Sequence, residues 1–485
     1  MTAGSTPGDA APVFRRVRRI FAATLFVACW LFAPACRSGG PSARTEGPAF
    51  RWEVVVDGDA RAASVTLSGE GVAADRLHAD HKRAFASAKD LADVGPGRVR
   101  WRVDLASSAS GGDFADPTLR GSDVVLSPDA LLLRPKDAAR DRDAELVWRS
   151  PPGSDVSAPF AETAPRSVLA DGTTIRTFRV DPTAAAFASR IAVVSRPLER
   201  IMAAGTEITL AVVGGRRGVA TPAGFVATAA EAAFSLTGPP REGRTQLVLI
   251  AGGRGSPFPF GMTFHGGGPG VVALYDERAR PSAVARDWVL AHEFLHAAMP
   301  VFEPGADWIS EGFVQYYTAV VRARAGLLTD SEAWDELFDG LERGAVAALQ
   351  DGGDLAEASV RMALTGAYQR VYWGGAAIAL LLDAELRRRS DGARSLDDAM
   401  RRLALHYGGR AVPLKVDDAL RDLDRAFGTD FIADSVRTAL ARKGPIEIGP
   451  VLARFGVSRH AEGRIVFDDG ATDAEVRRAV LRPRR

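Results

Sequence analysis

The chain has 485 residues, of which 46% are hydrophobic and 25% are charged, a composition typical of globular proteins with two or three domains. Its 61 Lys and Arg residues balance 60 Asp and Glu residues and leave a formal net charge of +1. This balance argues against a nucleic-acid-binding protein, which needs a broad basic surface, and against an acidic disordered chain.

The N-terminus carries the signals of an exported protein. The basic string "FRRVRRI" leads into the apolar stretch "IFAATLFVACWLFA", which is too short to span a bilayer comfortably but suits a signal peptide. The stretch ends in "APAC", which resembles a bacterial lipobox, with Ala33 where leucine is commoner. We therefore predict a signal peptide over residues 1–36 and a lipid on Cys36. The alternatives are an ordinary signal peptide and an uncleaved anchor.

The cysteine content fits this prediction. Cys29 lies in the apolar stretch and Cys36 would carry the lipid, so the mature chain has no thiol left for a disulfide. Arg37 and Ser38 follow, and the absence of aspartate there resembles the sorting signal for the outer membrane. We expect a lipid anchor in the bacterial envelope, with the protein facing the periplasm or the cell surface.

Beyond the signal peptide, the pattern predicts a multidomain α+β protein. Residues 37–49 are rich in Gly, Pro and Ser and predict a flexible tether. Short alternating or β-branched runs predict an all-β, sandwich-like domain over residues 50–185. Strands and one helix alternate over residues 186–281, which predicts an α/β lobe, and three- and four-residue apolar spacing predicts a helical lobe over residues 282–442. A short α/β appendage covers residues 443–485.

Two local signals predict where individual helices begin or end. The string "GFVATAAEAAFSLTG" predicts a helix that ends at Gly238, between strands "ITLAVVGG" and "TQLVLIAGG". In the helical lobe, Ser395 and Asp398 predict a capping box at a helix start.

The string "HEFLH" is the strongest chemical signal. Residues four apart lie on one face of a helix, so His292 and His296 can bind one metal ion, while Glu293 lies near a water on that metal. A hydrolytic Zn²⁺ site needs a third protein ligand. Glu311 is the first candidate, because the 14 intervening residues allow a turn and a second, antiparallel helix. Glu303 and Asp307 are the rivals, and Asp307 is also the expected N-cap of that helix.

A family resemblance supports this interpretation. "HEFLH" followed by "DWISEGFVQYY" resembles the gluzincin zinc metallopeptidases, which have a thermolysin-like catalytic domain. The strings "YWGGA", "LLLDAELR" and "SLDD" make the glycyl aminopeptidase family the most similar. The resemblance implies one Zn²⁺ ion bound by His292, His296 and Glu311, with Glu293 as general base and Tyr372 stabilising the oxyanion. The alternative for Tyr372 is a core aromatic residue.

The chain also departs from the family pattern. The spacing from His296 to Glu311 is shorter than in the aminopeptidases, and the chain after residue 442 is too short for the PDZ-like domain of that family. The family binds the free amine of its substrate with a glutamate on the edge strand before the zinc helix. The matching stretch is "FHGGGPGVVALYDE", where Gly270 stands about at that position, with Asp276 and Glu277 further along. Endopeptidase action is therefore at least as plausible as aminopeptidase action.

The glycine-rich stretch still suits an edge strand. His265, Gly266, Gly267 and Gly268 would let an extended peptide approach closely, because glycine has no side chain. A simple loop is the alternative.

The sequence leaves two classes of function open. The first is a lipid-anchored zinc peptidase with a peptide or protein substrate. The second is a catalytically inactive lipoprotein that uses the fold as a binding or envelope-assembly module. The intact Glu293 favours the first, because a binding module has no need of a general base. Substrate preference and oligomeric state remain open.

Overall fold

The computed structural model describes residues 48–483, apart from residues 60, 79–87, 106–117, 137–142, 182–188, 217–218, 411 and 461. The predicted signal peptide, with Cys29 and Cys36, lies outside these residues, as does nearly all of the predicted tether. Among the described residues, no helix has the length and apolar character needed to cross a membrane.

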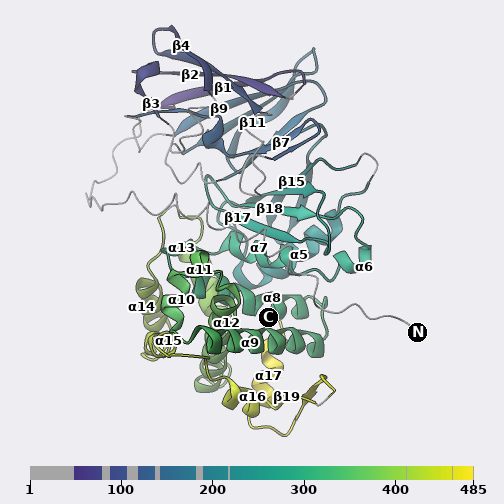
Figure 1. Ribbon diagram of the computed structural model, residues 1–485, viewed down its shortest axis with the longest axis vertical. Helices are drawn as coiled ribbons and strands as arrows, with labels where there is room; N and C mark the ends of the chain where they lie inside the picture. Colours follow the sequence, from purple (N-terminus) through teal and green to yellow (C-terminus); the bar gives the residue numbers. More distant parts are fainter. Residues whose placement is uncertain are drawn as a thin grey trace.

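The N-terminal part is a β-sandwich of two sheets (upper part of Figure 1). The larger sheet has seven strands, in the order β11 (Ala161–Val168), β12 (Thr174–Val180), β9 (Ala144–Ser150), β1 (Phe50–Val56), β2 (Ala62–Gly69), β5 (Arg98–Asp104) and β4 (Ala88–Gly95). The smaller sheet has four, in the order β10 (Asp155–Ser157), β13 (Ile191–Val194), β7 (Asp123–Leu126) and β6 (Thr118–Arg120). A short ribbon pairs β3 (Leu77–His78) with β8 (Arg134–Pro135).

Alternation of buried and exposed residues determines which face of each strand points inward. In β1, Phe50, Trp52, Val54 and Val56 are buried and the residues between them are more exposed. The apolar side chains of both sheets form one core between them. This part of the structure confirms the expected β-rich N-terminal region.

The four-stranded sheet is buried on both faces. One face packs against the seven-stranded sheet, and the other, through Val125, Ala192 and Val194, packs against the next sheet of the molecule. Strand β13 had been expected in the α/β lobe, but it pairs with β7 and β10 instead. Its four consecutive buried residues explain this position, because a strand covered on both sides reads as a continuous apolar run.

The α/β lobe is built on a five-stranded sheet. Its order is β14 (Glu199–Ala203), β15 (Thr206–Val213), β16 (Arg244–Ala251), β18 (Gly270–Tyr275) and β17 (Phe260–Phe264). The three central strands are parallel, and the two outer strands are antiparallel to their neighbours. Helix α5 (Ala223–Thr237) ends at Gly238, as predicted, where a φ of +79° favours glycine.

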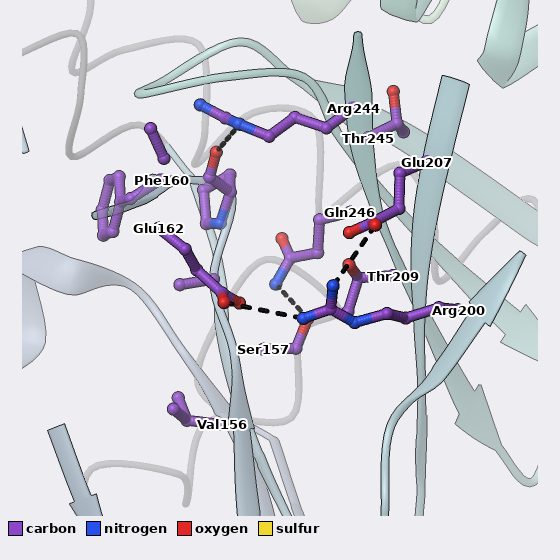
Figure 2. Close-up of a pocket in the computed structure, with 13 residues that line it drawn as sticks. Val156, Ser157, Phe160, Glu162, Arg200, Glu207, Thr209, Arg244, Thr245 and Gln246 are labelled. Atoms are coloured by element: carbon purple, nitrogen blue, oxygen red, sulfur yellow. Dashed lines mark hydrogen bonds and ion pairs between the residues drawn. The ribbon is translucent and has the colours of Figure 1, made fainter. Parts of the chain in front are cut away.

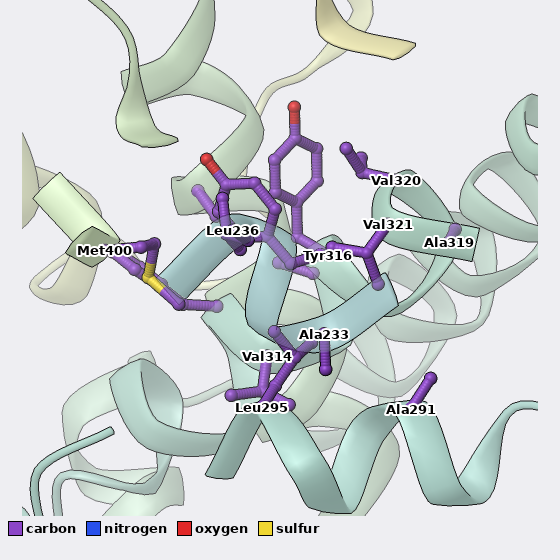
Figure 3. Packing of buried hydrophobic residues seen from close by; sticks show 14 of the residues in the cluster. Ala233, Leu236, Ala291, Leu295, Val314, Tyr316, Ala319, Val320, Val321 and Met400 are labelled. Carbon is purple, nitrogen blue, oxygen red and sulfur yellow. The ribbon is translucent and has the colours of Figure 1, made fainter. Parts of the chain in front are cut away.

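Helix α7 (Val289–Ala298) carries "HEFLH" and lies between the sheet and the helical lobe (Figure 1). It follows the short helix α6 (Pro281–Val284). Apolar residues of α5, α7 and α8 (Asp307–Arg324) pack together in one core that also includes α13 (Leu396–Tyr407) (Figure 3). The helix that carries the candidate ligands is therefore buried in the centre of the molecule.

The helical lobe continues from α8 to α15. Its other helices are α9 (Asp330–Asp351), α10 (Leu355–Val360), α11 (Met362–Thr365), α12 (Tyr368–Arg389), α14 (Val416–Phe427) and α15 (Ile432–Leu440). The predicted capping box of Ser395 and Asp398 is confirmed at the start of α13. Asp307 is the first residue of α8 and not its N-cap; Ala306 occupies that position without a side-chain cap.

A buried ionic network joins α8, α12 and α13. Arg324 pairs with Asp397 at 3.0 Å and Arg387 pairs with Asp383 at 3.0 Å, while the Tyr317 hydroxyl donates to Asp397 at 2.8 Å. Arg387 also lies 3.7 Å from Asp397, so the strings "LLLDAELR" and "SLDD" meet in this network. Removing one partner of such a network leaves a buried charge uncompensated, so the network fixes how the three helices pack.

The C-terminal appendage packs on α9. It contains α16 (Gly449–Phe455), the hairpin of β19 (Val457–Arg459) and β20 (Ile465–Phe467), and α17 (Ala474–Leu481). Arg459 binds the carboxylates of Asp335 and Glu342 at 3.0 Å each and also that of Asp339. The guanidinium lies over the ring of Phe338.

Helices α8 and α12 cross at two glycines. A β-carbon added to Gly312 would lie 2.4 Å from the Cα of Gly375, and one added to Gly375 would lie 1.8 Å from the carbonyl oxygen of Trp308. Only glycine allows this approach, because any side chain would collide with backbone atoms that cannot rotate away. The crossing places the N-terminal halves of both helices side by side.

We expect Gly375→Ala to lower the free energy of unfolding by about 3 kcal/mol or more, because the added methyl group overpacks a backbone contact. Gly374→Ala is the matched control, since its methyl group would meet only the end of the Leu355 side chain, at 2.9 Å. Urea unfolding of both variants measures the difference. Equal stability of the two would contradict the close crossing.

Candidate metal centre and active site

The candidate metal ligands come from two antiparallel helices. His292 and His296 lie one turn apart on α7, and Glu311 lies in the second turn of α8. The carboxylate of Asp287 accepts a hydrogen bond from the backbone amide of Val289 at 2.8 Å and so stabilises the start of α7. The two helices meet with His296 beside Glu311 and His292 beside Thr318, further along α8.

The three candidate ligands converge on one point. The Nε2 atoms of His292 and His296 are 3.2 Å apart, and each lies 3.3 Å from Oε2 of Glu311. Zinc–ligand bonds of about 2.0–2.2 Å in a tetrahedral arrangement place the ligand atoms about 3.3–3.5 Å apart. The three atoms therefore match three corners of a zinc tetrahedron, and no other group of this kind occurs among the described residues.

Thr318 determines which nitrogen of His292 is available to a metal. Its hydroxyl donates to the carbonyl oxygen of Val314 at 2.7 Å, so its oxygen accepts a hydrogen bond from Nδ1–H of His292 at 3.1 Å. This leaves the lone pair of Nε2 pointing to the side of Glu311. The site thus holds the tautomer that a metal ligand needs.

The charges of the site favour an ionised third ligand. Burial would raise the pKa of Glu311, but the imidazoles of His296 and His292 lower it well below its usual range. The carboxylate is therefore ionised at neutral pH. An anionic oxygen beside two imidazole nitrogens is a donor set that zinc prefers.

Glu293 lies against the edge strand β17. Its carboxylate is 2.8 Å from the Thr263 hydroxyl, which also approaches the Glu293 carbonyl oxygen at 2.9 Å. Burial raises the pKa of Glu293, and the charges of His292 and His296 together with the hydrogen bond from Thr263 partly offset this rise. A raised carboxyl pKa suits a general base near neutral pH. Gly261 makes room, because an added β-carbon would lie 2.7 Å from Cγ of Glu293.

Tyr372 lies beside the candidate ligands. Its ring stacks on that of His292 with centroids 6.5 Å apart and planes 13° apart. Burial raises the pKa of its phenol, and the charge of Glu311, with which it forms a hydrogen bond, raises the pKa further. The protonated hydroxyl is therefore available as a hydrogen-bond donor. Trp288 packs edge-on against the other side of His292, at 5.4 Å.

The rival third ligands have other roles. The carboxylate of Glu303 accepts a hydrogen bond from the backbone amide of Val416 at 3.0 Å and so stabilises the start of α14. Asp307 lies one turn before Glu311, and burial together with the charge of Glu311 raises its pKa to about 6. Only Glu311 groups with the two histidines.

The glycine-rich stretch is not the edge strand. The edge strand is β17, at Phe260–Phe264, and residues 265–269 form the turn into β18, so Gly270 begins an internal strand. The loop alternative for this stretch is therefore correct, because positive φ angles of +75° at Gly267 and +140° at Gly268 interrupt the extended backbone. Gly266 is buried in this turn.

His265 begins the same turn. Burial lowers the pKa of its imidazole to about 4, and the nearby His296 contributes to this shift. His265 is therefore neutral at neutral pH and lies near the candidate metal ligands. The two other acids considered for amine binding are already bonded, Asp276 to the amide of Arg278 and Glu277 to that of Arg216.

Sequence reasoning missed Thr318 and Thr263. Thr318 follows Glu311 by seven residues, which is two helical turns and the same face, so helical spacing gave a usable signal. Thr263 had no such signal, because its contact with Glu293 depends on how strand β17 packs on α7.

We expect Thr318→Val to weaken zinc binding about 10- to 100-fold, because His292 loses the acceptor that fixes its tautomer and orientation. Thr318→Ser keeps the hydroxyl and is the matched control. Titration of each purified variant against a competing chelator gives the dissociation constants. A valine variant that binds zinc as tightly as the serine variant would show that Thr318 does not orient the histidine.

Comparisons with known proteins bear on the fold. Neither a protein-family profile nor a curated protein matches the sequence. Among solved structures, an aminopeptidase N family protein from Idiomarina loihiensis is similar with a TM-score of 0.66 and 18% identity, over 84% of this chain and 78% of that one. A mutant of the M1 zinc metallopeptidase from Deinococcus radiodurans, bound to a Tyr-Ser-Ala substrate, is similar with a TM-score of 0.51 and 14% identity, over 82% of this chain and 94% of that one.

Both similarities extend over most of the chain. The fold therefore agrees with the family resemblance of the sequence. The expected multidomain α+β architecture is confirmed. The chain shares the fold of the aminopeptidase N family protein and of the M1 zinc metallopeptidase.

Proposed function

We propose that this protein is a zinc-dependent metallopeptidase held at the bacterial cell envelope by a lipid on Cys36. The observation that carries the proposal is the convergence of His292, His296 and Glu311 at the spacing of a zinc tetrahedron, with Glu293 beside them. The fold, similar to that of zinc metallopeptidases, agrees with this chemistry. The N-terminal signal supports the anchor and the location in the envelope.

Each residue of the site has its own role in the proposed hydrolysis. A zinc ion bound by the three ligands would supply a Lewis acid that lowers the pKa of a water molecule towards about 7. Glu293 takes a proton from the attacking water and then delivers it to the leaving amine. The Tyr372 hydroxyl donates a hydrogen bond to the oxyanion of the tetrahedral intermediate.

Strand β17 supplies a place for the substrate backbone. It is the edge of the five-stranded sheet, so its outer side can pair with an extended peptide. The strand reads FGMTF and holds no carboxylate. We therefore propose that a free α-amine is not required, and that the enzyme also cleaves N-blocked peptides.

We expect Glu293→Gln to lower kcat about 10²- to 10⁴-fold while zinc remains bound, because the amide cannot accept the proton. The matched control is Glu303→Gln, which keeps the acceptor oxygen at the start of α14 and leaves the metal site unchanged. Hydrolysis of a quenched fluorescent peptide and elemental analysis of the purified proteins measure both effects. A glutamine variant at position 293 with undiminished turnover would remove Glu293 from the mechanism.

We expect free-amine and N-acetylated versions of the same peptide to be hydrolysed at comparable rates, and both rates to fall to background with a zinc chelator. Cleavage of neither version, with zinc bound, would favour the alternative of a catalytically inactive lipoprotein. A strong preference for the free amine would contradict our proposal. It would point to Asp307 as the amine-binding group, because this acid lies one turn before Glu311.

A further inference from the structure

The turn between β17 and β18 packs against the β domain. A β-carbon added to Gly267 would lie 2.3 Å from Cδ1 of Phe160, and one added to Gly268 would lie 2.4 Å from the carbonyl oxygen of Pro159. Phe160 is 2% exposed and belongs to the core of the sandwich. The absence of side chains at the two glycines therefore lets a loop of one domain reach the backbone of the other.

Polar contacts also join the β-domain segment around Pro159 to strand β16 (Figure 2). Arg244 of β16 donates a hydrogen bond to the Pro159 carbonyl oxygen at 2.8 Å, and the Gln246 side chain donates to the Ser157 hydroxyl at 3.1 Å. The Gln246 backbone amide also donates to the carbonyl oxygen of Pro269, in the glycine-rich turn, at 3.1 Å. We call residues 157–160 together with Arg244, Gln246 and the turn 265–269 the interdomain clamp.

A cavity lined by ion-paired side chains lies beside the clamp. Arg200 of β14 bridges Glu162 of the β domain, at 3.6 Å, and Glu207 of β15, at 3.2 Å. These side chains line a cavity of about 190 Å³ together with Gln246 (Figure 2). The cavity leaves this part of the interface loosely filled, so contacts between the domains here depend on the clamp.

Strand β17 connects the clamp to the proposed general base, Glu293. The turn follows β17 without a gap, and β17 contacts Glu293 through Thr263 and Gly261. His265, in the turn itself, lies near His296. β17 pairs with β18 on one side and forms the edge of the described sheet on the other, so the turn that joins the two strands supports the end of β17.

We propose that Phe160 is a positioning residue, through which the β domain holds the glycine-rich turn and strand β17 in the register that binds an extended peptide. Phe160 does not contact the candidate metal ligands, and it acts through the backbone of the turn. The proposal rests on the peptidase function proposed above, because it assigns β17 to substrate binding.

The kinetic test compares Phe160→Ala with Phe50→Ala. Phe50 is 4% exposed in the same sandwich core and packs on Trp52, so its truncation costs comparable packing without touching the turn. We expect Phe160→Ala to raise KM about tenfold while kcat and zinc content stay near wild-type values, because the pairing of β17 with the peptide backbone is weakened equally in the ground state and the transition state. Phe160→Leu, which keeps an apolar side chain of similar length, should recover most of the loss.

An unchanged KM in Phe160→Ala, or an equal rise in Phe50→Ala, would overturn the proposal. Hydrogen–deuterium exchange of the amides of residues 260–269 gives a readout that does not need activity. Exchange there should accelerate in Phe160→Ala and not in Phe50→Ala, at matched stability. If the wild-type protein hydrolyses no peptide, the peptidase function fails, while this exchange experiment still decides whether the clamp holds the turn.

Discussion

The close crossing of α8 and α12 at Gly312 and Gly375 is the contact on which the candidate site depends. Glu311 immediately precedes the first glycine, and Tyr372 lies one turn before the second. Because the backbones touch, the third candidate ligand and the candidate oxyanion donor face the same side of α7. The Tyr316 hydroxyl of α8 donates to Asp383 of α12 at 2.9 Å, and Arg324 of α8 and Arg387 of α12 both pair with Asp397 of α13. Helix α8 therefore cannot shift along α12 without breaking buried polar contacts.

The metal site is organised in layers outward from α7. The helix packs against the five-stranded sheet, α5 and α8, which bury His292 and leave His296 only partly exposed. Thr318 fixes the tautomer of His292 from behind, and Thr263 holds the carboxylate of Glu293 from the opposite side. Each chemical group thus has a neighbour that fixes its orientation, which is the condition for catalysis by preorganised groups.

The β domain packs closely on the α/β lobe. Its four-stranded sheet shares one core with the seven-stranded sheet and another with the α/β lobe, so the sandwich and the catalytic sheet form consecutive layers (Figure 1). The glycine-rich turn beside the active site meets this domain through Phe160 and Pro159. A segment that resembled a substrate-binding strand is therefore part of an interface between domains.

Features that depend on local spacing could be predicted from the sequence. The spacing of His292 and His296 placed two imidazoles on one helix face, Ser395 and Asp398 formed a capping box, and Gly238 ended a helix, because each depends on residues within a turn or two. Other features became visible only in the folded chain, such as which strand forms the edge beside Glu293 and where β13 pairs. The folded chain also showed that Glu303 supports α14 while Glu311 joins the histidines. These features depend on contacts between segments that lie far apart in the chain. The local sequence around a glycine is similar in a loop, at a helix crossing and under a neighbouring domain, because its role depends on which distant atoms pack against it.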